Sequence, residues 1–364
     1  ILFAIIFFLF SIFIYYFTFL RILSHIITPL LKFLLILYKK YAFNYCFSQE
    51  TQVFFDVNSW YNDSILNLGG YLMSNTILRN ENVSVTLKSL GGELTSIKDA
   101  SGTEYLWQGN PDFWSGQAPV LFPIVGCLRN GTATIGDSKT CSFGRHGLAR
   151  KLEFTLVSSS ETCAVYSLKA DDSTKEQYPY DFELQMIYEL TDHGVKVSHK
   201  VINHGDIVMP YCIGGHPAFN CPLKAEEKQS DYQLSFDTDK TLVCSILGET
   251  GLLTARKKEF ELTNHKMRIV EDLFDEDALI IEGNQAKRVG LVNPQGETYL
   301  EVEFDAPLFG IWSPAKKSAP FVCIEPWYGR SDKEDFSKKL EEREWGNELE
   351  AGEVFEKSYQ IYVK

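Results

Sequence analysis

The sequence lacks several patterns that would assign a function class at once. Its eight cysteines form no CxxC pair, and it contains no glycine-rich phosphate loop, dinucleotide fingerprint, HExxH or GxSxG motif. These absences argue against a zinc framework and against the enzyme classes that those motifs mark. Basic charge is also scarce, because 35 Lys and Arg face 48 Asp and Glu, for a net charge of −13. A protein that binds nucleic-acid backbones usually carries a basic face, so nucleic acid is not expected as a partner.

Charged residues are absent from the first twenty positions, and methionine is absent before Met73. Taken literally, residues 1–38 predict one or two membrane spans followed by a basic flank. Residues 1–72 are dominated by Phe, Ile, Leu, Tyr, Asn and Lys, the mixture that translated AT-rich DNA gives. Our hypothesis is that the protein starts at Met73 and that residues 1–72 are untranslated upstream sequence, with a membrane anchor as the alternative. The scattered cysteines are typical of a reduced compartment and predict a cytoplasmic location.

Helical periodicity is rare after residue 73, where apolar and polar residues alternate instead. Alternation at 83–87, 182–190, 195–201 and 300–304 predicts half-buried strands, the middle two joined as a hairpin. Residues 333–343 are the best helix candidate, on charge and length rather than on an apolar stripe. No repeat or linker divides residues 73–364, so we expect a single all-β domain, a large antiparallel β-sandwich with few short helices. Such a sheet can curve and leave a concave face for a ligand.

Two ionisable residues stand in unusually constrained surroundings. His216 lies in "CIGGHPAFNCP", where a glycine pair permits close approach of the backbone and Pro217 disfavours a helical conformation of the histidine. Glu325 lies in "FVCIEPWYG", where an apolar strand continues into a carboxylate. Burial there would raise the pKa of Glu325 toward the range of a general base. The structural alternatives are a stiff turn at His216 and a strand-end ion pair between Glu325 and Arg330.

Carboxylate, imidazole and aromatic rings together suit a sugar substrate. Aromatic faces stack on the C–H faces of sugars, while a carboxylate and an imidazole can move protons between hydroxyl groups. Further candidates are His146 in "GRHGLAR", Asp277 in "DEDALI" and the aromatic Trp312. Each has a structural alternative, as a surface turn residue for His146 and a solvated acidic loop for Asp277. No second carboxylate shares the setting of Glu325, so the paired acids of glycosidases are not evident.

The order of several segments resembles a known family. "PVLFPIVG", "HGLAR", "YPYDFEL", "MPYCIGGHPAFNCPL", "DALI" and "CIEPWYGRSD" resemble the aldose 1-epimerase (galactose mutarotase-like) family, in its LacX-like branch, from about residue 76 to the C-terminus. The resemblance implies a β-supersandwich, no metal or cofactor, and interconversion of the α and β anomers of a free sugar. By motif it implies Glu325 as base, His216 as acid, His146 as a substrate-binding residue, and Asp277 as a partner of sugar hydroxyls.

One position departs from the LacX-like pattern. Those sequences usually read "FPIVGRL", with an arginine that is a candidate sugar contact, whereas here the position is Cys127. Arg129 follows two residues later and, on a strand, would point to the same face, so it is a candidate replacement.

Two other functions stay open. A hexose-6-phosphate 1-epimerase is the first, because a related branch also carries an HG-x-AR motif and Arg150 could then contact phosphate. Against it, those relatives carry an arginine just before their "PLVFP"-like segment, where this chain has Gly116, Gln117 and Ala118. A non-catalytic sugar-binding or sensing module on the same scaffold is the second. The preferred sugar and the oligomeric state do not follow from the sequence.

Overall fold

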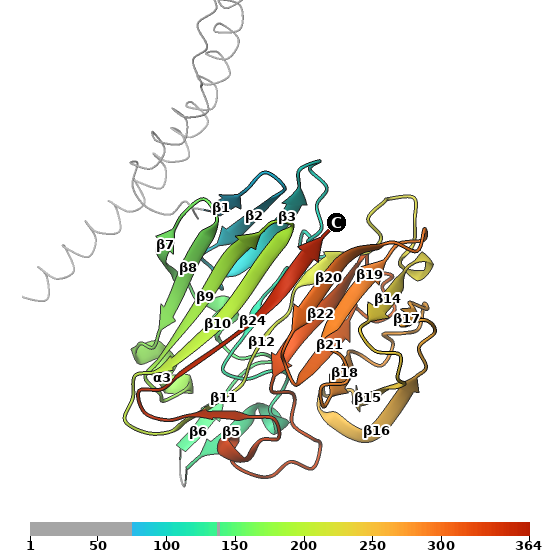
Figure 1. Cartoon of the computed structure of the whole chain (residues 1–364). Helices are drawn as coiled ribbons and strands as arrows, with labels where there is room; N and C mark the ends of the chain where they lie inside the picture. Colours follow the sequence, from blue (N-terminus) through green and yellow to red (C-terminus); the bar gives the residue numbers. More distant parts are fainter. Residues whose placement is uncertain (1–74, 137–138) are drawn as a thin grey trace, which may run out of the picture. The chain divides into compact units, whose positions relative to one another are not determined.

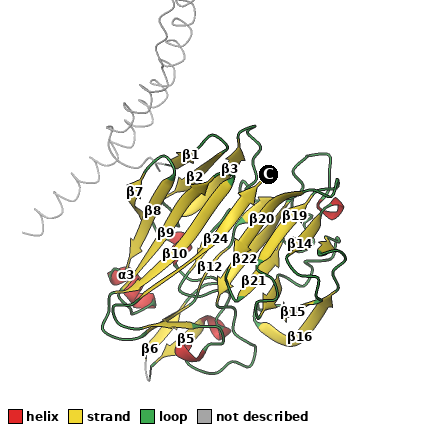
Figure 2. Cartoon of the chain, viewed as in Figure 1, coloured by secondary structure: helices red, strands yellow, loops and turns green. Residues whose placement is uncertain are grey.

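Antiparallel strands make up most of the regular secondary structure among the described residues. The computed structural model describes residues 75–136 and 139–364, and its two large sheets are seen in Figure 1, with strands coloured yellow in Figure 2. The predictions for residues 1–38 and 1–72 lie outside the described residues. Within the described part, no helix has the length and apolar character needed to cross a membrane.

In both large sheets, the spatial order of the strands differs from their order along the chain. From edge to edge, the larger sheet contains β17 (Lys266–Arg268), β14 (Gln233–Phe236), β19 (Arg288–Val292), β20 (Thr298–Phe304), β24 (Val354–Val363), β10 (Gly194–Asn203), β9 (Phe182–Thr191), β8 (Cys163–Lys169) and β7 (Thr155–Ser159). The second contains β16 (Leu253–Phe260), β15 (Leu242–Leu247), β18 (Leu279–Glu282), β21 (Leu308–Trp312), β22 (Phe321–Tyr328), β12 (Ile213–Gly215) and β4 (Val120–Leu121), with β13 (Ala218–Asn220) also paired to β22.

Smaller elements complete the fold. One sheet contains β1 (Thr76–Arg79), β2 (Val83–Lys88) and β3 (Glu93–Asp99), while β5 (Thr132–Ile135) pairs with β6 (Lys139–Ser142) and β11 (Met209–Tyr211) pairs with β23 (Asn347–Leu349). The described helical elements are α3 (Asp172–Gln177) and the 3₁₀ turns η1 (Arg129–Gly131), η2 (Ala149–Lys151), η3 (Gln229–Asp231) and η4 (Leu340–Glu342).

Alternation along the strands separates the main core from the face that carries the site. On β22, Val322 and Ile324 belong to the large core cluster, which also holds Val195 and Val197 of β10 in the other sheet. Successive strand residues point to opposite faces. The intervening β22 positions, among them Glu325, therefore face away from the main core, over the outer surface of the second sheet. The sandwich buries one face of this sheet and leaves the other available for a pocket.

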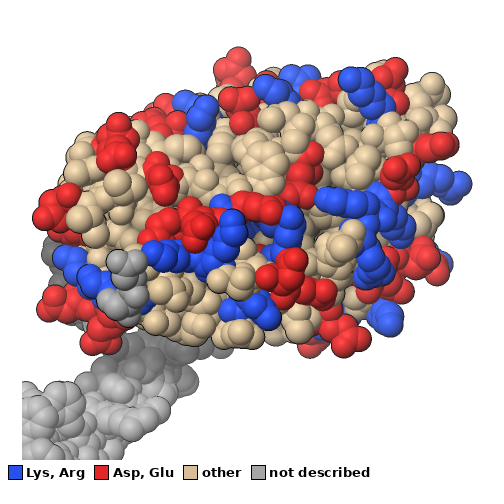
Figure 3. Space-filling view, turned by 90° about the horizontal axis from the view of Figure 1, so that it is seen from below, with Lys and Arg blue, Asp and Glu red and all other residues tan. Residues whose placement is uncertain are grey.

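The predicted all-β antiparallel sandwich is confirmed. The four predicted strands correspond to β2, β9, β10 and β20, and β9 and β10 form the predicted hairpin, with Thr191 opposite Gly194. The predicted helix at 333–343 is wrong, because this segment is irregular except for η4. Its sequence has no apolar stripe to bury, and a helix this short needs one to be stable. Acidic and basic side chains are intermingled over the face seen in Figure 3.

Candidate active site

A pocket of 300 Å³ lies on the outer face of the second sheet. Its lining combines three indole rings with ionisable side chains: Trp114, Trp312, Trp327, Arg145, Arg150, His146, His216, Asp277 and Glu325. A larger groove of 870 Å³ lies elsewhere, along residues 222–230, 270–275 and 313–320, and holds none of the predicted site residues. The smaller pocket is the candidate site, because it gathers buried titratable groups and aromatic faces in one place.

Glu325 reaches the pocket from the middle of β22. Every residue of this strand is buried, and the Glu325 side chain is 1% exposed. The opposite residue on β21 is Gly310, where a Cβ would lie 2.6 Å from the Trp327 ring. A glycine is therefore needed for the indole to pack against β21 beside the carboxylate. The expected alternative, an ion pair with Arg330, is not formed, since Arg330 contacts Glu282 and Glu344 instead.

His216 occupies the connection between β12 and β13, directly after two glycines. A Cβ on Gly214 would lie 2.7 Å from the Trp327 ring, and one on Gly215 would lie 2.8 Å from the Tyr359 ring. The glycine pair thus allows β12 to approach β22 and β24 closely, which holds the histidine against the catalytic candidate on β22. The imidazole is stacked on Trp114, with ring centroids 4.9 Å apart, and meets Trp312 edge-on.

The two side chains meet at the floor of the pocket. His216 Nε2 and Glu325 Oε2 lie 3.4 Å apart. Burial raises the pKa of Glu325 well above its usual range, and this effect outweighs the opposing influence of the positive charge of Arg145. Burial also lowers the pKa of His216 to about 3, aided by the charges of Arg150 and Arg145. Both shifts favour the uncharged forms, and the uncharged pair offers one transferable proton and one proton acceptor.

His146 lies on the pocket wall in a left-handed conformation, with a φ of 67°. The backbone N–H of His146 donates to the Gly126 carbonyl at 2.8 Å, and the backbone N–H of Gly126 donates to the ring Nδ1 of His146 at 3.1 Å. Burial, together with the positive charge of nearby groups, lowers the pKa of His146 well below its usual value. The ring is therefore neutral, with Nδ1 as acceptor and the proton on Nε2. His146 can therefore donate a hydrogen bond from Nε2 while the ring remains uncharged.

The remaining predicted residues divide into those at the pocket and one elsewhere. Asp277, Arg150 and Trp312 line the pocket, so it contains six of the seven predicted side chains. Arg129 lies away from it, because its guanidinium donates to the Phe336 carbonyl at 3.0 Å. The expectation that it lies on a strand is wrong, since it begins η1. Arg129 therefore does not reach the pocket, contrary to the expectation that it could replace an arginine at position 127.

Four polar or aromatic residues of the pocket are not among the candidates named from the sequence, namely Trp114, Arg145, Trp327 and Ser331. Trp114 comes from an irregular segment without a recognisable pattern. Arg145 directly precedes the candidate His146, but no local pattern indicates that its side chain points into the pocket. A long basic side chain in a glycine-rich turn is ordinarily solvated.

One group of side chains could in principle hold a metal ion. His216, Cys323 and Glu325 place a ligand atom each within 4.8 Å of one another, the one such group in the described ranges. Burial raises the pKa of the Cys323 thiol, as it does that of Glu325. Thiols and carboxylic acids must lose their protons before they bind a metal. The resting protonation of this group therefore favours proton transfer over metal binding.

Known proteins place these features in one family. The family model for aldose 1-epimerase matches residues 74–362. The chain belongs to the aldose 1-epimerase family. It is 39% identical over 296 residues to the plasmid-encoded protein LacX of Lactococcus lactis subsp. lactis, a match that covers 79% of this chain and 98% of LacX. The resemblance noted from the sequence is thereby confirmed, and the chain is an isomerase of the epimerase type.

Solved structures agree with this assignment. A galactose mutarotase related enzyme from Lactobacillus acidophilus has a TM-score of 0.76 at 32% identity, covering 80% of this chain and 97% of its own. A galactose mutarotase-like protein from Lactobacillus casei has a TM-score of 0.75 at 26% identity, covering 80% of this chain and all of its own. Both support the sandwich architecture of the epimerase.

Proposed function

We propose that this epimerase interconverts the α and β anomers of a free hexose by acid–base ring opening, with Glu325 as base and His216 as acid. The observation that carries the proposal is the 3.4 Å separation of Glu325 Oε2 and His216 Nε2 at the floor of one aromatic-lined pocket. Anomerisation of a hemiacetal needs one proton donor and one proton acceptor near the anomeric carbon. This pair supplies both.

The proposed steps balance in protons and bonds. The Glu325 carboxylate takes the proton of the anomeric hydroxyl while the His216 imidazolium protonates the ring oxygen, and the bond from C1 to the ring oxygen breaks. The open-chain aldehyde rotates about C1–C2, and the ring oxygen attacks the other face of C1. His216 then takes back its proton and Glu325 returns its own, which leaves the other anomer and the original enzyme.

The roles require a particular distribution of one proton. Neutral Glu325 with neutral His216 contains as many protons as carboxylate with imidazolium, so the two forms interconvert without exchange with solvent. Burial favours the neutral form in the empty pocket. Sugar hydroxyl groups that replace water at the floor would hydrogen-bond to the charged form and favour it. The charge of Arg145 lowers the pKa of Glu325 and of His216 alike, so it favours the carboxylate and disfavours the imidazolium, and the two effects oppose each other.

The walls of the pocket suit a sugar ring. Trp114, Trp312 and Trp327 offer apolar ring surface, and the neutral His146 offers an Nε2–H donor for a hydroxyl. An uncharged hydrogen-bond donor can bind a hydroxyl oxygen without competing for the proton that Glu325 and His216 share. We therefore propose that His146 and Asp277 orient the sugar while Glu325 and His216 act on it.

A hexose 6-phosphate is the second candidate substrate, and Arg150 is the observation that favours it. Its guanidinium lines the pocket, makes no ion pair among residues 75–136 and 139–364, and has a buried Nε without a partner there. A phosphate group would supply that partner. Against this candidate, Arg150 Nη2 already donates to the Arg145 carbonyl at 3.1 Å, which fixes the guanidinium on the wall.

Anomerisation is tested directly by following freshly dissolved α-glucose and α-galactose by polarimetry with purified protein, against buffer and heat-denatured protein. We expect acceleration over both controls, and glucose 6-phosphate in the same assay decides between the substrate classes. A clear preference for the phosphate would transfer the proposal to the hexose 6-phosphates. Folded protein that binds sugar without accelerating anomerisation would be a binding module instead.

A further inference from the structure

Arg145 and Asp277 face each other at the mouth of the pocket. Arg145 Nη1 lies 3.3 Å from Asp277 Oδ2, and the two side chains are 44% and 29% exposed. At the floor, Glu325 is 1% exposed. A sugar with its anomeric carbon at Glu325 would therefore present the far side of its ring to the Arg145–Asp277 pair.

The pair has hydrogen-bonding capacity to spare. A guanidinium has five N–H donors, and the contact with Asp277 uses one of them. The 3.3 Å distance is longer than the roughly 2.7–2.9 Å of a strong charge-assisted hydrogen bond. Ion pairs this exposed contribute little to stability, so a ligand can open them at small cost. Asp277 Oδ1 accepts from the Ala278 N–H at 2.9 Å, which fixes the carboxylate and turns Oδ2 toward Arg145.

The surroundings of Arg145 are shaped for its guanidinium. Gly251 has a φ of +74°, and a Cβ there would lie 2.2 Å from Arg145 Nη2 and 3.2 Å from Cys127 Sγ. The guanidinium thus lies in a space bounded by a glycine and a small thiol. A long side chain at position 127 would compete for the same space, so Cys127 and Gly251 together make room for Arg145.

We propose that Arg145 is the specificity-determining residue of this epimerase and, together with Asp277, binds two hydroxyl groups on adjacent ring carbons remote from the anomeric carbon. Neighbouring hydroxyls present two oxygens side by side, which matches a guanidinium donor beside a carboxylate acceptor. The substrate class is thus an aldose with both hydroxyls free. This inference rests on the proposed function.

The test is a cycle between an enzyme variant and a set of substrates. Arg145→Gln and the wild type are assayed with glucose and with its 2-, 3- and 4-deoxy analogues. A hydrogen bond to a charged group corresponds to about 10- to 100-fold in binding. We expect Arg145→Gln to raise KM for glucose at least about tenfold with kcat within about threefold, because the contact is equally strong in substrate and transition state. The penalty disappears with the one analogue that lacks the partner hydroxyl.

The control is Arg256→Gln. Arg256 is an exposed arginine on β16 that pairs with Glu276, the neighbour of Asp277, outside the pocket. Its removal changes charge to the same extent and leaves KM unchanged. The inference is overturned if Arg145→Gln leaves KM within twofold of the wild type, lowers kcat instead, or carries the same penalty with every deoxy sugar.

Failure of the proposed function has a different signature. If the wild type does not accelerate anomerisation, the catalytic proposal fails, while the same cycle measured as Kd by calorimetry still tests the Arg145 contact. Equal Kd values of wild type and Arg145→Gln for glucose then overturn the inference on its own terms.

Discussion

Two groups of largely buried polar side chains use their hydrogen-bonding atoms differently. The pocket cluster consists of Arg150, His216, Glu325 and Trp327. The arginine network consists of Glu282, Arg330, Asp332, Arg343 and Glu344. Glu325 and Trp327 are on β22, and the network begins directly after that strand, at Arg330. The charges of the arginine network are paired with one another, whereas several polar atoms of the pocket cluster have no hydrogen-bond partner.

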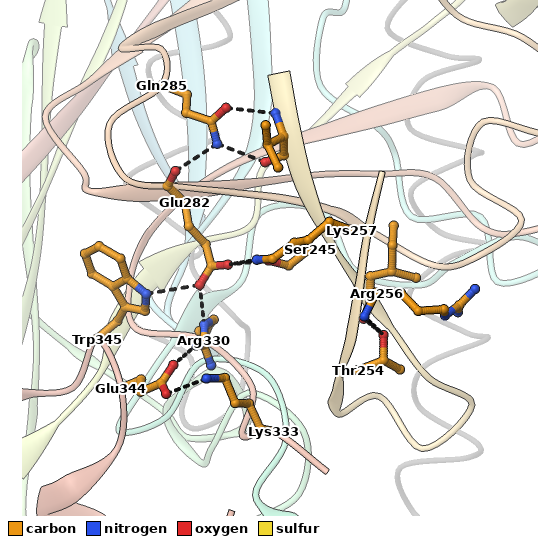
Figure 4. A network of polar contacts seen from close by, with 12 residues as sticks. Ser245, Thr254, Arg256, Lys257, Glu282, Gln285, Arg330, Lys333, Glu344 and Trp345 are labelled. Carbon is orange, nitrogen blue, oxygen red and sulfur yellow. Dashed lines mark hydrogen bonds and ion pairs between the residues drawn. The ribbon is translucent and has the colours of Figure 1, made fainter. Parts of the chain in front are cut away.

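The arginine network pairs its charges. Arg343 Nε lies 2.6 Å from Asp332 Oδ1, with both side chains 2% exposed, and Arg343 Nη2 donates to the Arg330 carbonyl. Arg330 contacts Glu282 and Glu344, and Trp345 donates to Glu282 at 3.0 Å (Figure 4). The Asp332 N–H in turn donates to the Cys127 carbonyl at 3.0 Å. This network fixes the chain behind the pocket.

The pocket cluster leaves polar atoms unpaired. In the described part of the chain, Arg150 Nε, His216 Nδ1, Glu325 Oε2 and Trp327 Nε1 are buried without a hydrogen-bond partner. Such atoms normally cost stability, and native proteins keep few of them. Their concentration in one pocket, a few residues from a fully paired network, indicates that the unpaired atoms await a polar ligand. The two groups therefore differ in whether their polar atoms have hydrogen-bond partners, and not in burial alone.

Breaking the arginine network should have the largest effect on stability. Asp332→Ala leaves Arg343 buried without its carboxylate, so we expect the free energy of unfolding to fall by about 3–5 kcal/mol. Urea denaturation measures this. The control, Glu276→Gln, removes an exposed ion pair and should cost about 0–1 kcal/mol. A loss below about 1 kcal/mol for Asp332→Ala would show that the network does not hold the fold.

Removing a pocket histidine should have the opposite profile. His216→Asn is expected to lower kcat at least ~100-fold, because the proposed acid is gone. The free energy of unfolding should fall by less than in Asp332→Ala, since Nδ1 has no hydrogen-bond partner to lose and the variant removes no paired charge. Steady-state kinetics and urea denaturation of the same preparation measure both. Near-normal turnover would remove His216 from the acid role, and a stability loss like that of Asp332→Ala would contradict the contrast between the two groups.

The smallest expected effect is a flat response to pH. The productive form holds one proton between His216, whose pKa is lowered to about 3, and Glu325, whose pKa is raised. A second proton binds only below the lowered pKa, and the shared proton is lost only above the raised one. From about pH 5 up to the raised pKa of Glu325, kcat/KM should thus stay within about twofold after subtraction of the uncatalysed rate. A fall on acidification centred near about 6.5 would mean an ordinary histidine.

The sequence predicted what depends on short-range pattern. Alternation along 182–190 and 195–201 predicted β9 and β10 because strand faces are set by neighbouring residues. Glu325 and His216 were found because proline, glycine and apolar residues constrain them locally. Contacts between segments that are distant in the sequence could not be predicted from local patterns. Arg145 enters the pocket only because Cys127 and Gly251 leave room for it, and Arg129 was misplaced because its segment is not a strand.

The segment after β22 shows the same limit. Its charges predicted a helix at 333–343, yet ion pairs with Glu282 and with Asp332 decide its path. Glu282 lies on β18, and Asp332 lies 11 residues before Arg343, beyond the i,i+3 and i,i+4 spacings of a helix, so no local pattern specifies either partner. Pairing across the fold overrides a helical tendency that lacks an apolar stripe.

The central claim is that Glu325 and His216 exchange protons with the sugar, and Glu325→Gln tests it most directly. Magnetisation exchange between the α and β anomeric protons, measured by NMR at equilibrium with wild type and variant, reports turnover without any change in sugar concentration. The account predicts that the wild type gives catalysed exchange, and that Glu325→Gln, with an unchanged midpoint of urea unfolding, loses at least ~100-fold of it. Exchange by the folded variant at near the wild-type rate would contradict the account.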